Sequence, residues 1–145
     1  MKEDKENIVK KKEVPKFTWI VLLVIGCIDL FRGIMHTIFI DEALALFAHF
    51  DPTNGDLMLQ MNAFGISNLI TGALCIMIAL KARHLADLAL IYIPFAYSIG
   101  IIAIKMNNIV ATSDFLGQFG MMAYIGICIG TFIATKMKIY FDNMK

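Results

Sequence analysis

Three ionisable residues lie within one otherwise apolar stretch near the N-terminus, GCIDLFRGIMH. Asp29, Arg32 and His36 are spaced three and four residues apart, so on a helix they lie within reach of one another. A charged side chain costs about 2.5–3.5 kcal/mol at the centre of a membrane helix, so such groups face protein or water. This grouping could bind a small ligand, pass protons, or serve as acid and base toward a lipid or quinone.

A second apolar stretch repeats the pattern around the aspartate. GISNLITG aligns with GCIDLFRG, and both fit G-x-x-[D/N]-L-x-x-G. Small residues let membrane helices approach closely, which predicts that the two stretches pack through their glycines, Gly26, Gly33, Gly65 and Gly72. Asn68 would then join Asp29 and Arg32 in a hydrogen-bonded cluster. Chance and an internal duplication explain the match about equally well.

Later stretches supply more polar groups. Pro94 usually bends a helix, and hydroxyl groups beside such a bend can line a cavity. The candidate polar site therefore comprises Asp29, Arg32, His36, Asn68, Thr71, Tyr97 and Ser98. Near the C-terminus, Gly126 and Gly130 form a G-x-x-x-G motif, which predicts packing within the bundle or, as the less favoured alternative, a dimer seam.

The elements that position these residues follow from hydropathy. The chain has 145 residues, of which 59% are hydrophobic, and a mean hydropathy of +0.71. A bilayer core of about 30 Å needs about 20 apolar residues per helix. The sequence thus predicts an all-α, polytopic membrane protein whose four transmembrane helices form an antiparallel bundle, at 17–40, 57–80, 85–107 and 115–136. The first is longer than the apolar region of a signal peptide and carries internal charge, which favours a permanent helix.

Lysine and arginine positions predict the orientation. The 1–16 tail is rich in lysine, the link at 81–84 holds Lys81 and Arg83, and the 137–145 tail is also basic, whereas the 41–56 link has neither residue type. Basic segments stay cytoplasmic, so we expect a multi-pass protein of the cell membrane with both termini in the cytoplasm. Lys105 is the exception, and its long side chain can reach the membrane surface.

The 41–56 link contains an apolar segment and a turn. DEALALFAHF predicts a short interfacial helix capped by Asp41, followed by the turn DPTNGD. His49, Asp51 and Asp56 could gather a divalent ion, but they lack a regular ligand spacing. We therefore favour a lid over the mouth of the bundle and expect no metal site.

Several other chemistries are not supported. Cys27, Cys75 and Cys128 all fall within the predicted helices and form no C-x-x-C pair, so buried packing is the default for them. Phosphate-binding loops, nucleophile elbows and H-E-x-x-H are absent from the sequence. We expect no cofactor and no nucleic-acid partner.

The architecture resembles that of the small DoxX-like membrane proteins. The shared features are four short helices, an arginine beside a glycine in the first helix, a second helix with glycines and polar residues, and cytoplasmic tails. The resemblance extends over most of the chain and implies the four-helix membrane fold. It carries no catalytic residue over to this sequence.

Two functions from different classes follow, and enzyme status is left undecided. Small size, the lack of cofactor motifs and the G-x-x-x-G favour a non-catalytic subunit or assembly protein, whose partners are the lipid bilayer and either a second copy or a larger membrane complex. The alternative is an outward-opening cavity that binds a small molecule or handles protons or solutes. A membrane enzyme acting on a lipid or quinone is a weaker third hypothesis.

Overall fold

The computed structural model describes residues 14–48, 53–110 and 117–144, and every regular element in those ranges is helical. Four of these helices are long and apolar enough to cross a membrane. They are α1 (Lys16–Thr37), α3 (Gly55–Lys81), α4 (Ala86–Met106, preceded by a 3₁₀ turn at Arg83–Leu85) and α5 (Gly117–Asp142). The all-α prediction with four apolar helices is confirmed at this level.

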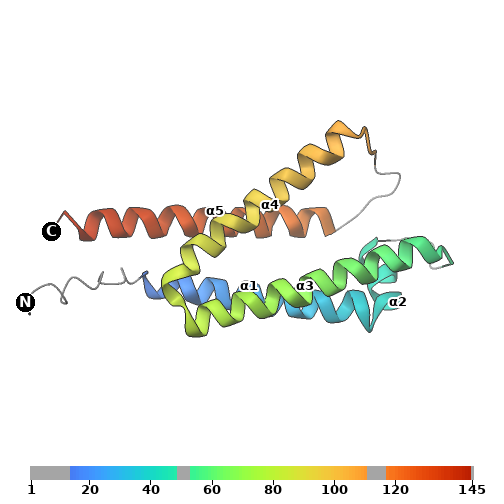
Figure 1. The fold of residues 1–145 in the computed structure, drawn as a ribbon, viewed down its shortest axis with the longest axis horizontal. Coiled ribbons are helices and arrows are strands. Elements are labelled where there is room, and N and C mark those ends of the chain that lie inside the picture. The colour runs from blue at the N-terminus through green and yellow to red at the C-terminus, as the bar shows by residue number, and fades with distance from the viewer. Residues whose placement is uncertain (1–13, 49–52, 111–116, 145) are drawn as a thin grey trace, which may run out of the picture.

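Helices α1 and α3 lie side by side and run in opposite directions (Figure 1). Their backbones approach at the repeated glycines. A Cβ atom added to Gly72 would lie 2.7 Å from the Gly26 carbonyl oxygen, and one added to Gly33 would lie 2.8 Å from the Leu69 nitrogen. Only glycine leaves room for contacts this close, so the repeated motif determines the tightest helix pair of the fold.

Helix α4 follows α3 through a short turn and packs on α5. Its first half is held in the core, where Ala86, Leu90 and Ile93 are buried. Its second half diverges from α1 and α3 (Figure 1). The helix runs unbroken through Pro94, and Ser98 Oγ donates to the Pro94 carbonyl oxygen at 2.8 Å.

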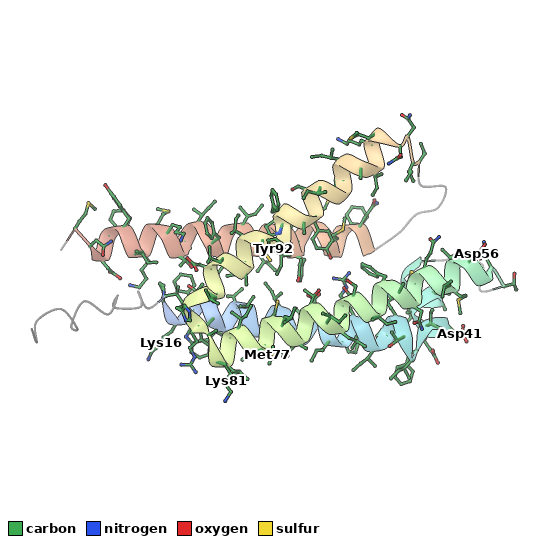
Figure 2. The ribbon with its side chains drawn as sticks, in the orientation of Figure 1. Lys16, Asp41, Asp56, Met77, Lys81 and Tyr92 are labelled. Carbon is green, nitrogen blue, oxygen red and sulfur yellow. The ribbon has the colours of Figure 1, made fainter. Side chains whose placement is uncertain are left out.

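Polar contacts join the helices near one end of the molecule. The Thr18 and Thr135 hydroxyl oxygens lie 2.7 Å apart and link α1 to α5. The Lys136 ammonium lies 2.6 Å from the Asp87 carboxylate and links α5 to α4. Lys16 and Lys81 lie at this same end, whereas Asp41 and Asp56 lie at the opposite one (Figure 2).

The end of the first helix and the start of the link after it differ from the predicted boundaries. Helix α1 ends at Thr37, and the link begins with α2 (Ile40–Ala43) and a π-helical turn at Leu44–Ala48. The prediction that Asp41 caps this short helix is wrong, because Phe39 occupies the N-cap position and Asp41 lies in the first turn. His49 and Asp51 lie outside the described residues, so the metal alternative is not tested there.

Helices α3 and α5 also differ in extent from the predicted helices. Helix α3 begins at Gly55 because the Asn54 side chain caps it by accepting a hydrogen bond from the Leu57 N–H at 3.2 Å. Helix α5 continues past residue 136 to Asp142, so most of the expected C-terminal tail is helical. A Lys138–Asp142 ion pair of 3.3 Å, one helical turn apart, supports this extension.

Candidate functional site

Asp29 lies at the centre of the polar groups and is 2% exposed. The Tyr124 hydroxyl of α5 donates to its Oδ2 at 2.6 Å, and Arg32 Nη1 lies 3.4 Å from its Oδ1. The shorter bond therefore comes from another helix, and the predicted partner Arg32 makes the longer contact. The Asp29 carboxylate therefore links α1 to α5 through Tyr124 and also makes a contact within α1 through Arg32.

Arg32 also lies against aromatic rings. Its guanidinium carbon is 5.5 Å from the centre of the Phe64 ring and 6.0 Å from that of Tyr124. These distances fall within the range at which a cation is attracted to a ring face. The rings and Asp29 together keep this positive charge within the bundle.

A pocket of about 320 Å³ lies beside Asp29, between α1, α3, α4 and α5. Its size is that of a small-molecule site, and its wall is mostly apolar with a few polar groups. Tyr92, which Figure 2 places near the middle of α4, belongs to the wall. The carboxylate, amide and aromatic side chains in its lining are those of Asp29, Asn68, Phe64, Tyr92, Tyr97 and Tyr124.

Asn68 is 5% exposed and forms part of the pocket wall. Its Nδ2 has no hydrogen-bond partner among the described residues. The predicted hydrogen bonds from Asn68 to Asp29 and Arg32 are therefore not formed. Tyr124 and Arg32 are instead the donors to the two Asp29 oxygens.

His36 lies on the same buried face of α1 but outside the pocket lining. It is 8% exposed, and its ring centre lies 5.4 Å from that of Phe64. Its Nδ1 has no hydrogen-bond partner within the part of the chain that the structure describes. Phe64 contacts both His36 and Arg32 and belongs to the pocket wall, whereas His36 does not line the pocket.

The remaining predicted site residues divide between the pocket and its surroundings. Thr71 belongs to the wall, and its hydroxyl donates to the Ser67 carbonyl oxygen at 2.9 Å. Tyr97 also belongs to it and packs edge-on against Tyr124, with ring centres 6.1 Å apart. Ser98 does not line the pocket, since its hydroxyl bonds within α4.

Two of the predicted packing glycines face no neighbour. A Cβ atom added to Gly126 or Gly130 would meet no atom within 4 Å. Among the described residues, this G-x-x-x-G therefore contacts no other helix of the chain, and α5 turns Tyr124 and Cys128 toward the other helices. The alternative of a dimer seam is not tested by a single chain.

Phe64, Tyr92 and Tyr124 are the aromatic lining residues that the predicted site did not include. Tyr124 lies 95 residues from Asp29, so no local spacing connects them. A buried carboxylate needs a donor, and a tyrosine in the middle of an apolar helix is the one signal that could have pointed to this pair.

Comparison of the chain with protein-family models, with functionally described proteins and with solved structures finds no match. The resemblance to DoxX-like proteins therefore stays a prediction.

Proposed function

We propose that this chain is a four-pass protein of the cell membrane that binds a small amphipathic molecule in the pocket beside Asp29. The observation that carries the proposal is Asn68, a residue of the pocket wall whose buried Nδ2 has no hydrogen-bond partner among the described residues. An unpaired buried donor costs about 1–3 kcal/mol. A ligand that accepts this hydrogen bond offsets that cost.

Charge distribution supports the membrane orientation within this proposal. Lys16 and Lys81 at one end mark the cytoplasmic side, and Asp41 and Asp56 at the other mark the outer side (Figure 2). The helices α1, α3, α4 and α5 then form an antiparallel bundle with both termini in the cytoplasm. The exposed side chains of Ile38, Phe39 and Leu46 fit a position of the α2 segment at the outer membrane surface.

The place of the pocket fits an outward-opening cavity. Its residues come from the middle of the helices. Asp29 late in α1 and Phe64 early in α3 lie nearer the Asp41 and Asp56 end, and Thr71 and Tyr92 lie just beyond the midpoints of α3 and α4. The second half of α4 diverges from α1 and α3 on this side (Figure 1). A small molecule could therefore enter between α3 and α4 from the outer leaflet.

Pocket filling provides the first test of binding. Two aromatic ketones of equal shape serve as probes, phenacyltrimethylammonium and neopentyl phenyl ketone, titrated into the protein in nanodiscs with empty nanodiscs as the blank. Ala96 lies in the pocket wall, so Ala96→Phe should abolish binding by occupying the space. Ala103→Phe, two turns further along α4 and outside the wall, is the matched control and should bind as wild type does.

Asn68→Leu tests the amide directly. It removes an unpaired donor at nearly constant volume, so we expect equal or higher thermal stability together with weaker ketone binding. Wild-type protein that binds neither probe would refute the proposed function. In that case a stoichiometric larger polypeptide copurifying with the chain would favour the second candidate, a non-catalytic subunit. The exposure of α5 supports this candidate, because 11% of an apolar 18-residue stretch of that helix is buried.

A further inference from the structure

The pocket wall combines one carboxylate with several aromatic rings. Among the described residues that line it, Asp29 is the charged side chain, and Arg32 is not part of the lining. The rings are those of Phe64, Tyr92, Tyr97 and Tyr124. The lining therefore presents a carboxylate and aromatic ring faces, which carry negative electrostatic potential, whereas the Arg32 guanidinium that contacts Asp29 lies outside the lining.

Organic cations are the ligands that this combination attracts. Ring faces that surround a quaternary ammonium group bind it without hydrogen bonds, and the attraction strengthens when water is excluded. A carboxylate close by adds Coulomb attraction, which is stronger at a buried site than in water. An anion of the same size would meet repulsion from Asp29 instead.

The chain itself provides an example of a cation in this environment. The Arg32 guanidinium already lies within 6.0 Å of the Phe64 and Tyr124 ring centres and contacts Asp29 at 3.4 Å. Tyr92 and Tyr97 are the lining rings that no cation of the chain contacts in the described residues. A second positive charge placed in the pocket would meet those two rings and share the Asp29 carboxylate.

We propose that the pocket takes a small organic cation that also carries a hydrogen-bond acceptor. Its ammonium group lies against Asp29 and the rings of Tyr92 and Tyr97, and its acceptor receives the hydrogen bond of Asn68 Nδ2. This inference rests on the proposed function, since it specifies the chemical class of the bound molecule.

The test compares three probes of one shape that differ in charge: phenacyltrimethylammonium, neopentyl phenyl ketone and phenacylsulfonate. All three carry the same phenyl ketone, so they differ at the cationic, neutral or anionic end group. We expect the cation to bind wild-type protein at least about tenfold more tightly than the neutral ketone, and the anion to bind most weakly. Asp29→Asn should abolish the preference for the cation over the neutral ketone, compared within this same variant.

The ring contribution is tested separately, in case Asp29→Asn fails to fold. Tyr92 is 68% exposed, so its replacement disturbs the core little. Tyr92→Leu should weaken cation binding several-fold, whereas Tyr92→Phe, which keeps the ring, should not. Phe95→Leu is the matched control, because Phe95 is an exposed ring on the same helix that does not line the pocket.

Each outcome bears on one proposal. Equal binding of the cation and the neutral ketone, or equal effects of Tyr92→Leu and Phe95→Leu on the cation, overturns this inference and leaves the proposed function standing. Tighter binding of the anion overturns it as well. Binding of none of the three probes overturns the proposed function and this inference with it.

Discussion

The interactions of Asp29 show how one residue changes its role between the sequence and the fold. Within its own helix, Arg32 is the partner within reach, and the pair satisfies the rule that membrane charges are compensated. In the folded chain the Tyr124 hydroxyl approaches more closely, at 2.6 Å. Asp29 therefore contributes both to helix packing and to the pocket wall.

Replacement of this hydroxyl gives the prediction at the residue scale. Tyr124→Phe keeps the ring but removes the donor, so it should lower the unfolding free energy by about 1.5–3 kcal/mol, the usual contribution of a hydrogen bond to a charged group. Tyr140→Phe is the control, because Tyr140 is 63% exposed on the same helix, and its effect should stay within about 0.5 kcal/mol. Thermal unfolding in detergent measures both, and equal midpoints for the two variants would contradict the role of the Asp29–Tyr124 bond.

At the scale of elements, α1 and α3 form the best-packed pair. Gly26 and Gly72 bring the two backbones together, and Leu22, Ile25 and Cys75 bury apolar surface around them. Helix α5, by contrast, meets the other helices mainly along the line from Tyr124 through Cys128 to Thr135. The repeated G-x-x-[D/N]-L-x-x-G motif and the G-x-x-x-G motif of α5 thus have different environments.

Two single substitutions distinguish these environments. Gly72→Ala places a Cβ atom 2.7 Å from both the Gly26 oxygen and the Leu30 nitrogen, so backbone must move and the unfolding free energy should fall by about 1–3 kcal/mol. Gly126→Ala meets no atom within 4 Å and should be neutral or raise stability by up to about 1 kcal/mol, because alanine favours the helix. Both variants are compared by thermal unfolding and by folded yield. A loss of stability at Gly126 as large as at Gly72 would show that α5 packs through its glycines, for example in a dimer.

At the scale of the whole molecule, charge separates toward the two ends. Lys16, Lys81 and the Lys136–Asp87 pair gather at one end, and Asp41 and Asp56 lie at the other (Figure 2). The α1 and α5 ends at Lys16 and Asp142 lie on the same side (Figure 1). This arrangement agrees with the proposed orientation, in which the chain makes an even number of passes through the bilayer.

Cysteine labelling in intact cells tests the orientation. An impermeant maleimide should label Gly55→Cys, a position where a side chain meets no neighbour and the Asn54 cap is kept. Ala82→Cys and Asn143→Cys should react only after the membrane is permeabilised. Wild-type protein is the control, because its cysteines lie within the apolar helices. Labelling of Ala82→Cys before permeabilisation would refute the model of four passes with both ends in the cytoplasm.

The sequence by itself determined the all-helical class of the fold, with four long apolar helices, and the buried face of the first helix. Apolar length and the spacing of Gly26, Asp29, Gly33 and His36 are local properties, and all four residues are buried on one face of α1. The repeated glycine motif placed α1 beside α3 for the same reason, since close backbone approach needs small residues at a fixed helical spacing.

Only the tertiary structure decided which groups surround Asp29. The pocket wall draws side chains from four helices, and the angle and rotation of α4 and α5 relative to α1 depend on the packing of the whole bundle. Hydropathy gives almost no information on how a helix is rotated about its own axis when the helix is apolar on all sides, because any face can then meet lipid. Helices α4 and α5 are of this kind. Tyr124, Tyr92 and Phe64 therefore join the site through packing, and the glycines at 126 and 130 are left outside the bundle for the same reason.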